Sequence, residues 1–421
     1  MERGSGRSAV RLAFVLWTGN IGGAEHHTVE LARTLKKRGC PVAIVFVSDA
    51  RPLVKGLHEA GVPHASLGLP RGRSVLRHPR RLARVVSALG PDAAVLISSG
   101  YLAAALRLGG YRAPIVAVEH GTILQVDRLP KHQRFIRALD RRSGIWACDA
   151  EVAVSRFLLE RLECEPRPRR VAWIPNGVDL ERFRPPNDAG GHAADGAPIF
   201  ACASRLIAEK GVADLLRAFA NAALDTACLR IAGDGPESER LRLLAGELGV
   251  ASRTQFLGPI LDMPSFWQAS SVAVVPSNEW VESFGMVAVE AMACARPVVA
   301  TDSGALREVV IDGQTGRVVP TGDIERLAAA LREYADDASR RKVHGWNGRR
   351  ACEERYDIEQ TATRYLELCR DIIDAGRATR SRRGYEAAYL FEKHPDTTAW
   401  KLDPTQKASC RTATGFDDGP R

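Results

Sequence analysis

Short apolar runs alternate with longer amphipathic segments along most of this chain. Each apolar run is followed by a polar loop and then by the i, i+3, i+4 periodicity of a helix. The predicted strands are 11–17, 41–47, 93–97, 114–118, 151–155, 199–203, 228–232, 254–257, 271–275 and 297–300. Apolar strands joined by helices are typical of parallel sheets covered on both faces. We therefore expect an α/β protein that binds its ligands at the carboxyl ends of the strands.

The alternation is interrupted by a segment rich in proline, glycine and small polar residues at 185–197. This composition predicts a flexible linker. The chain has 421 residues, so it is long enough for a folded domain on each side, which we place at 9–184 and 198–355. Polar residues without a sustained period, 377–421, are predicted to form a disordered tail. The Asp-Gly-Gln-Thr-Gly segment at 312–316 predicts a hairpin-like turn.

Composition indicates a globular protein without a disulfide framework or a zinc site. Apolar residues make up 45% of the chain, and the nine cysteines are odd in number and form no C-x-x-C pair, which favours reduced thiols in the cytoplasm. The longest apolar-rich stretch, 93–106, is shorter than the ~20 residues that span a bilayer. The apolar segment 9–17 contains an arginine and lacks a cleavage site, so we interpret it as a first core strand rather than a signal peptide.

Positive charge is concentrated in the first predicted domain. The net charge is +9, and residues 60–91 include six arginines but no acidic residue. A later helix carries cations at helical spacing and apolar residues on another face: Lys131, Arg134, Arg137 and Arg141, with Phe135, Ile136 and Leu139. Such a helix can contact an anionic membrane at its inner, cytoplasmic face, although a solvated helix has the same pattern. Nucleic-acid binding is the weakest alternative, because the arginine run contains no aromatic residue for base stacking.

The segment 276–293 holds the densest set of candidate site residues. It follows a predicted strand and ends in an alanine-rich helix. The free N–H groups of a first helical turn favour anions. Two carboxylates flank this turn, Glu282 in the loop and Glu290 about two turns deeper. Because a carboxylate can accept hydrogen bonds from neighbouring hydroxyls, a phosphate at the helix start with hydroxyls on both sides describes a nucleotide sugar.

Other strand-end loops add weaker candidates. Gly22 and Gly23 precede a helix, where glycine lets the backbone approach a ligand closely. His120 follows a buried strand and precedes a glycine, a position from which a side chain can face a ligand. Arg205 and Lys210 follow another strand, and two cations at this spacing can clamp a diphosphate. Structural turns and solvated loops show the same patterns, so none of them identifies a site alone.

Together these motifs, over about residues 10–375, resemble those of the retaining GT-B glycosyltransferases of family 4. The paired glutamates, Ser-Phe-Gly after Glu282, and the Arg205…Lys210-Gly211 run are similar to the family's motifs. The resemblance implies two Rossmann-like parallel-sheet domains that face a central cleft. It also implies that a C-terminal helix, 356–376, crosses back to the first domain.

The resemblance assigns roles to individual residues. Glu282 and His120 would contact the transferred sugar, Arg205 and Lys210 would neutralise the departing diphosphate, and Glu290 would hold the ribose. Further nucleotide-sugar contacts are assigned to Ser283, Phe284, Gly285, Met286, Gly22, Gly23, Asp234 and Ile260.

Together with what the resemblance implies, these observations predict a retaining, metal-independent hexosyltransferase. It would move a hexose or N-acetylhexosamine from a nucleotide diphosphate sugar, with UDP slightly favoured over GDP, to an acceptor hydroxyl. The acceptor would be a lipid-linked or polysaccharide precursor, or a soluble molecule such as an antibiotic aglycone or an inositol phosphate. No residue stands out as a covalent nucleophile, and no D-x-D motif occurs, so neither a metal nor another cofactor is expected. The alternatives are a phosphorylase or epimerase of the same fold, and a nucleotide-sugar-binding protein without turnover.

Overall fold

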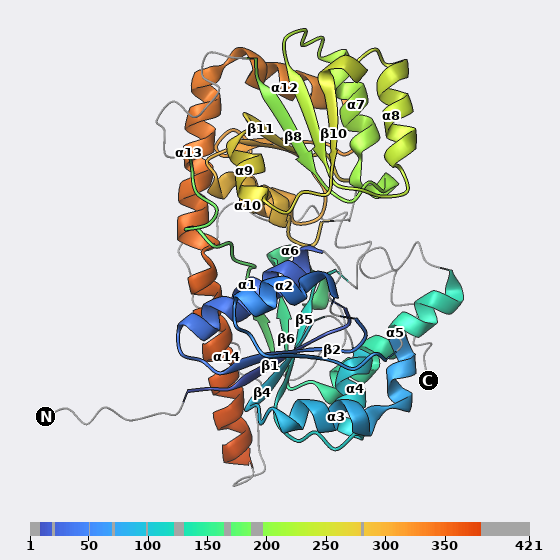
Figure 1. Cartoon of the computed structure of the whole chain (residues 1–421), viewed down its shortest axis with the longest axis vertical. Coiled ribbons are helices and arrows are strands. Elements are labelled where there is room, and N and C mark those ends of the chain that lie inside the picture. Colours follow the sequence, from blue (N-terminus) through green and yellow to red (C-terminus); the bar gives the residue numbers. More distant parts are fainter. Residues whose placement is uncertain are drawn as a thin grey trace, which may run out of the picture. The chain divides into compact units, whose positions relative to one another are not determined.

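The computed structural model describes residues 9–18, 22–49, 51–69, 72–97, 100–121, 130–163, 170–186, 197–278 and 282–379. Contacts divide the chain into two compact units (Figure 1). Unit 1 comprises residues 1–20, 39–174 and 366–421, and unit 2 comprises residues 21–38 and 175–365. This division groups residues 21–38 with unit 2, whereas sequence analysis counted them with the first domain. Most of the predicted linker, 187–196, and the tail from 380 lie outside the described residues.

Unit 1 is built on a parallel sheet of seven strands in the order β3-β2-β1-β4-β5-β6-β7. The strands are β1 (Leu12–Leu16), β2 (Val42–Phe46), β3 (His64–Ser66), β4 (Ala93–Ile97), β5 (Ile115–Glu119), β6 (Ala150–Ala153) and β7 (Val171–Trp173). The helical elements are α2 (Arg51–Glu59), η1 (Gly72–Arg77), α3 (Pro79–Ala88), α4 (Gly100–Leu108), α5 (Lys131–Ala147) and α6 (Arg156–Glu163), together with α14 (Ile358–Thr379) from Leu366 onward.

Unit 2 repeats the topology with six parallel strands in the order β10-β9-β8-β11-β12-β13. The strands are β8 (Ile199–Ala203), β9 (Cys228–Ala232), β10 (Thr254–Gly258), β11 (Val272–Val275), β12 (Val298–Thr301) and β13 (Gly316–Val319). The helical elements are α1 (Gly23–Lys37), η3 (Ala208–Lys210), α7 (Val212–Asn221), α8 (Ser238–Glu247), η4 (Ala251–Arg253), α9 (Met263–Gln268), α10 (Met286–Ala293), α11 (Leu306–Val309), α12 (Ile324–Asp336) and α13 (Ala338–Arg355).

The central strands are buried along their whole length, which explains their uninterrupted apolar sequences. Every residue of β1, β4, β11 and β12 is buried. In each unit the strand order reverses beside the first strand, between β1 and β4 in unit 1 and between β8 and β11 in unit 2. Ligands of open parallel sheets bind outside the carboxyl ends of the strands at such a reversal. The predicted α/β class with parallel sheets is confirmed.

Three short strands were not predicted, and one predicted hairpin-like turn is present without joining two antiparallel strands. β3 and β7 have three residues each and β13 has four, too few for a clear pattern. Residues 312–316 do form a turn, in which the Gly313 amide donates to Gly316 O at 2.9 Å, but this turn leads into β13, which pairs parallel with β12. The last helix also reaches further than predicted, to Thr379. Over the part of the chain that the structure describes, no helix is long and apolar enough to cross a membrane.

Candidate functional site

The loops that follow β8 and β11 meet at the strand reversal of unit 2. Because these strands are neighbours, their carboxyl ends lie side by side. The amide of Asn278 donates to Glu209 O at 2.9 Å, and its side-chain nitrogen donates to Ala208 O at 3.1 Å. The approach is so close that a Cβ atom at Gly211, whose φ is +66°, would lie 1.9 Å from Pro276 O. Glycine is therefore required here for both its conformation and its size.

The loop after β12 holds the β11 loop from its other side. The Ala305 amide donates to Glu282 O at 2.8 Å, and a Cβ atom at Gly304 would lie 2.0 Å from the same oxygen. The hydroxyls of Thr301 and Ser303 donate to the carbonyl oxygens of Ser277 and Asn278. The backbone around Glu282 is thus fixed by both neighbouring loops, although residues 279–281 lie outside the described part of the chain.

Glu282 and Lys210, predicted on separate loops, form an ion pair. Lys210 Nζ lies 2.6 Å from Glu282 Oε1, and the buried Ser277 hydroxyl donates to the same oxygen at 2.6 Å. Burial opposes the charge on Glu282, but the Lys210 ammonium and these hydrogen bonds outweigh it, so its pKa lies below the usual value. The exposed Arg205 adds to this effect. The loops therefore hold an ionised carboxylate beside two cations.

The helix α10 begins directly after this pair. Gly285, with φ +98°, is its N-cap, and a Cβ atom there would lie 2.7 Å from a methyl carbon of Leu306. Phe284 is buried edge-on against Tyr356, with ring centroids 5.6 Å apart. Ser283 and Met286, on either side, are partly exposed. Phe284 thus supports the turn by packing, whereas its neighbours can reach a ligand.

Gly22 and Gly23 lie at the start of α1, close to the start of α10. Gly22 is the extended N-cap of α1, and a Cβ atom at Gly23 would lie 3.7 Å from Met286 Cγ. The φ of Gly22 is −141°, which any residue can adopt. The structure therefore brings two predicted segments together, but does not require glycine at these positions for backbone conformation.

Glu290 lies on the second turn of α10 in a half-buried position. The indole nitrogen of Trp267, a fully buried side chain on α9, donates to Glu290 Oε2 at 3.4 Å. Burial raises the pKa of Glu290 to about 7, against the opposing effects of this hydrogen bond and of the Arg182 charge. A carboxyl that titrates near neutrality can accept hydrogen bonds from hydroxyl groups or donate one itself.

This shifted pKa predicts a pH-dependent stability. Between pH 4.5 and about 7 the folded state retains a proton that the unfolded chain releases, so the free energy of unfolding falls as the pH rises through this window. We expect wild type to lose about 1–3 kcal/mol over this range relative to Glu290→Gln, which cannot titrate. Urea unfolding of both proteins from about pH 5 to about pH 8 measures the difference. Parallel stability curves for the two proteins would contradict the assignment.

The remaining predicted residues follow other strands, and among them Asp234 accepts a hydrogen bond at its carbonyl oxygen from the amide of Leu206, next to Arg205, at 2.9 Å. His120 follows β5 in unit 1, and burial lowers its pKa to about 4, so its imidazole is neutral at neutral pH. Asp234 follows β9 and accepts hydrogen bonds from the Gly235 amide and the Ser238 hydroxyl, which lower its pKa. Ile260 is partly exposed in the turn after β10. Among the described residues, no group of three or more histidine, cysteine or acidic side chains could hold a metal.

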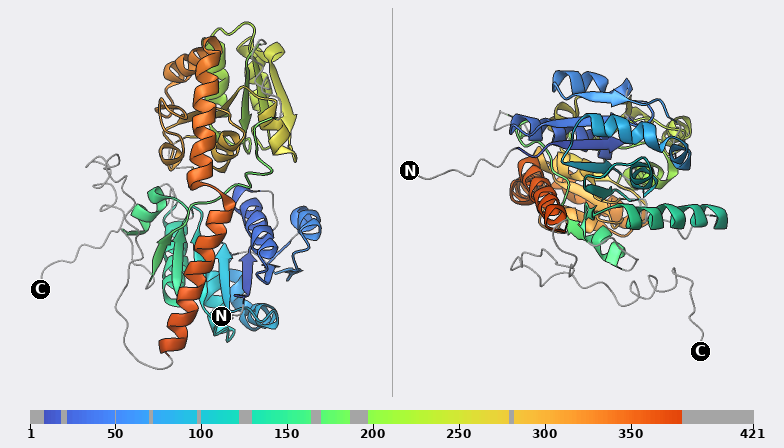
Figure 2. Two further views of the ribbon diagram at one scale, coloured as in Figure 1. Left: turned by 90° about the vertical axis from the view of Figure 1, so that its left-hand side faces the viewer. Right: turned by 90° about the horizontal axis from the view of Figure 1, so that it is seen from below.

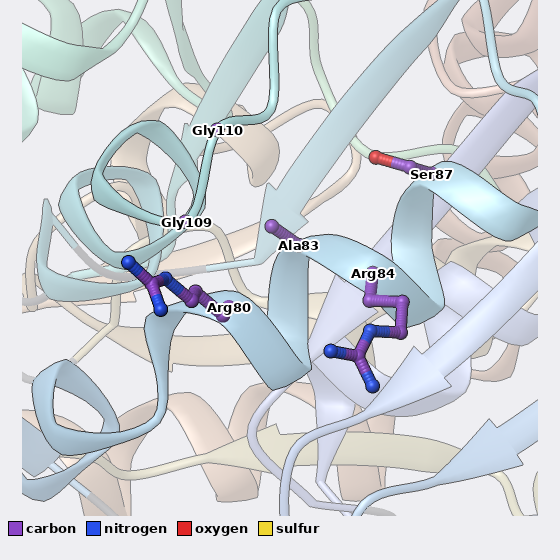
Figure 3. Close-up of a pocket in the computed structure, with 6 residues that line it drawn as sticks. All are labelled: Arg80, Ala83, Arg84, Ser87, Gly109 and Gly110. Carbon is purple, nitrogen blue, oxygen red and sulfur yellow. The ribbon is translucent and has the colours of Figure 1, made fainter.

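A surface pocket of about 290 Å³ lies elsewhere, in unit 1 (Figure 3). It is lined by α3 and the end of α4: Arg80, Ala83, Arg84, Ser87, Gly109 and Gly110. The guanidinium groups of its two arginines point in different directions rather than toward a common point. The pocket does not include any of the predicted site residues.

Sequence reasoning missed the residues that hold the two glutamates. Ser277 and Trp267 each donate a hydrogen bond to one of them. Ser277 is a common loop residue, and Trp267 precedes Glu290 by 23 positions on a different helix. No spacing rule connects such pairs, because their contact depends on how α9 and the β11 loop pack against α10.

Comparisons with known proteins identify the family. Residues 21–182 match the model described as Glycosyltransferase Family 4, and residues 184–351 match Glycosyl transferases group 1. A GDP-mannose-dependent alpha-(1-6)-phosphatidylinositol monomannoside mannosyltransferase of Mycolicibacterium smegmatis is 32% identical, over 65% of this chain and 74% of its own. A D-inositol 3-phosphate glycosyltransferase of Geodermatophilus obscurus is 30% identical, over 75% of this chain and 78% of its own.

Solved structures share the fold at low sequence identity. Sucrose-phosphate synthase from Thermosynechococcus elongatus aligns with a TM-score of 0.72 and 22% identity, over 87% of this chain and all of its own. Anabaena HepE in complex with UDP aligns with a TM-score of 0.73 and 20% identity, over 86% of this chain and all of its own. This chain therefore belongs to the group 1, family 4 glycosyltransferases, enzymes of the GT-B fold that use nucleotide-sugar donors.

Proposed function

We propose that this enzyme is a retaining, metal-independent hexosyltransferase whose donor site lies in unit 2. The donor would bind at the reversal between β8 and β11. There, Arg205 and Lys210 lie beside the ionised Glu282, and α10 begins immediately after it. This cluster is the observation that carries the proposal, because it offers cations and helix N–H groups to a diphosphate and a carboxylate to sugar hydroxyls.

The cluster suits the charges that develop when a glycosidic phosphate bond breaks. Negative charge grows on the departing diphosphate, where Arg205, Lys210 and the first turn of α10 would stabilise it. Positive charge grows on the sugar, and the carboxylate of Glu282 would oppose it and orient a hydroxyl. The neutral His120 suits a hydrogen-bonding contact to the sugar rather than an ionic one. With two cations in place, no divalent metal is needed to bridge the diphosphate.

The relatives bear on the donor and the acceptor. The mycobacterial relative is named for GDP-mannose and a phosphatidylinositol mannoside, and the second for an inositol phosphate. These names favour GDP-mannose over the UDP sugar that we slightly favoured from sequence. They also favour an acceptor that contains inositol, either lipid-linked or soluble. Glu290 would hold the ribose of either nucleotide, because the ribose is common to both.

Nucleotide binding provides the first test. We expect GDP or UDP at about 100 times Kd to add about 2.7 kcal/mol to the free energy of unfolding of wild type. Glu290→Ala should abolish this gain, because it removes the acceptor for the ribose hydroxyls. Glu239→Ala, which changes an exposed carboxylate in the first turn of α8, should preserve it. Thermal unfolding of wild type and both variants, with GDP, UDP, ADP or the corresponding nucleotide sugars added, measures this gain in stability.

Turnover then separates the remaining alternatives. Incubation of the stabilising sugar nucleotide with inositol phosphate or a phosphatidylinositol glycoside should release the nucleotide, and the anomeric configuration in the product should match that of the donor. Release that requires inorganic phosphate would indicate a phosphorylase instead. Stabilisation without turnover on any acceptor would favour a binding protein, and the absence of stabilisation at millimolar nucleotide would refute the donor site.

A further inference from the structure

The helix α5 presents a row of large apolar side chains to solvent. Phe135, Leu139 and Trp146 are 66%, 44% and 66% exposed. At 100° per residue these three positions fall within one narrow stripe of the helix. Single exposed apolar residues are ordinary on protein surfaces, but an apolar stripe along one helix indicates a surface that binds another molecule or a membrane. Figures 1 and 2 show α5 reaching beyond the rest of unit 1.

Contacts with α4 fix which face of α5 points outward. Gly100 and Gly144 approach so closely that a Cβ atom at Gly144 would lie 3.1 Å from Gly100 Cα. The Tyr101 amide donates to Asp140 Oδ1 at 2.7 Å, and its hydroxyl donates to Ile136 O at 2.8 Å. These contacts lie on the side of α5 opposite the apolar stripe, so the exposed stripe follows from the packing of α5 on α4.

Positive charge surrounds the stripe. The exposed Lys131 and Arg142 fall on the same side of α5 as Phe135 and Trp146. The whole helix carries five cationic residues and one acidic residue. A second basic helix of the unit, α3, adds three exposed arginines, Arg80, Arg81 and Arg84. Aromatic and aliphatic residues flanked by lysine and arginine are the composition of helices that lie in the interface of an anionic membrane.

We propose that this stripe, Phe135, Leu139 and Trp146 with Lys131 and Arg142, docks unit 1 onto an anionic lipid bilayer. The apolar side chains enter the headgroup–acyl boundary, and the two cations contact lipid phosphates. A second copy of the chain is a poorer occupant, because a two-fold contact of α5 with itself would juxtapose like charges. The proposal goes beyond the donor site, and it holds whichever nucleotide the enzyme uses.

Vesicle flotation tests the proposal directly. The full chain should float with vesicles of phosphatidylcholine and phosphatidylglycerol, but weakly with phosphatidylcholine alone or at high salt. Phe135→Ser/Leu139→Ser/Trp146→Ser should lower the partition coefficient by about a hundredfold, because three apolar side chains stay in water. Lys131→Gln/Arg142→Gln should lower it roughly fivefold per charge. Brominated lipids should quench wild-type fluorescence more than that of Trp146→Phe.

A matched control lies in unit 2. Leu243→Ser/Val343→Ser/Trp346→Ser also removes three exposed apolar residues, including a tryptophan, and should bind vesicles as wild type does. The increase in stability on nucleotide binding should be the same in all these variants as in wild type. A defect in the donor site can therefore be distinguished from a loss of membrane binding. The proposal is overturned if wild type does not bind anionic vesicles or if the α5 variant binds equally well. It is also overturned if the α5 substitutions change the oligomeric state in light scattering instead.

Discussion

Replacing Lys210 with methionine is expected to lower the free energy of unfolding by about 3–5 kcal/mol, because it leaves Glu282 buried without its counter-charge. The side chains of this pair are only 16% and 14% exposed, and the ammonium is the nearest cation to the carboxylate. The same change should slow nucleotide release from the donor by about 10²–10³-fold, the usual effect of removing one preorganised electrostatic group. Urea unfolding and a nucleotide-release assay measure the two effects.

The two effects can be separated by a second substitution. In Lys210→Met/Glu282→Gln no unpaired charge remains, so most of the lost stability should return while activity stays low. Lys342→Met, on the exposed surface of α13, should change stability by less than about 0.5 kcal/mol. A double variant as unstable as Lys210→Met would show that the pair is not the source of the loss. Full activity in Lys210→Met would remove this lysine from the donor site.

Gly211→Ala should destabilise the chain by about 4 kcal/mol or more. Single substitutions lower stability this much only when they create a severe steric clash or a comparable defect. Its added methyl group would lie 1.9 Å from Pro276 O, so the β8 and β11 loops must separate. Gly249 provides the control, since its φ of +70° is close to the +66° of Gly211 but no atom lies within 4 Å of the added carbon. Gly249→Ala should therefore cost only the left-handed backbone conformation, about 1–2 kcal/mol.

Chemical denaturation compares the two alanine variants, and nucleotide stabilisation reports on the loops. Gly211→Ala should also weaken nucleotide binding, because the loop that carries Glu282 moves with Pro276. Gly249→Ala should leave nucleotide binding unchanged. If Gly211→Ala and Gly249→Ala lost equal stability, the β8 and β11 loops would accommodate the added methyl group by moving. The close packing at Gly211 would then not control the donor site.

Most of the fold could be predicted because its strands are both buried and separated by periodic helices. β11 and β12 are apolar at nearly every position, and such sequences are typical of buried strands. β13 has the sequence Gly-Arg-Val-Val, and two of its four residues are only partly buried. With so few residues, the preceding Asp-Gly turn dominated the prediction and suggested a hairpin. The four-residue helix α11, which makes the connection parallel, is too short to show helical periodicity.

The site was predictable as a set of loops but not as a set of contacts. The strand–loop–helix order placed Lys210 and Glu282 at carboxyl ends of strands, yet their pairing requires β8 and β11 to be neighbours. The order of the strands in the sheet cannot be read from the sequence of the chain. The helix α5 shows the same limit, because sequence analysis grouped Ile136 with Phe135 and Leu139. In the structure Ile136 is partly buried on the α4 side, and Trp146 joins the exposed stripe instead.

The discontinuity of unit 1 has a consequence for synthesis on the ribosome. Its last strand, β7, ends at Trp173, but the unit also includes the chain from Leu366, where Leu368 and Cys369 are buried. At about 5–20 residues per second, translation reaches that segment about 10–40 s after β7 has emerged. During this interval the nascent unit 1 lacks part of its core, while residues 175–365 of unit 2 are being made. The domain that begins first is thus completed last, and nascent chains depend on protection of its apolar surface until then.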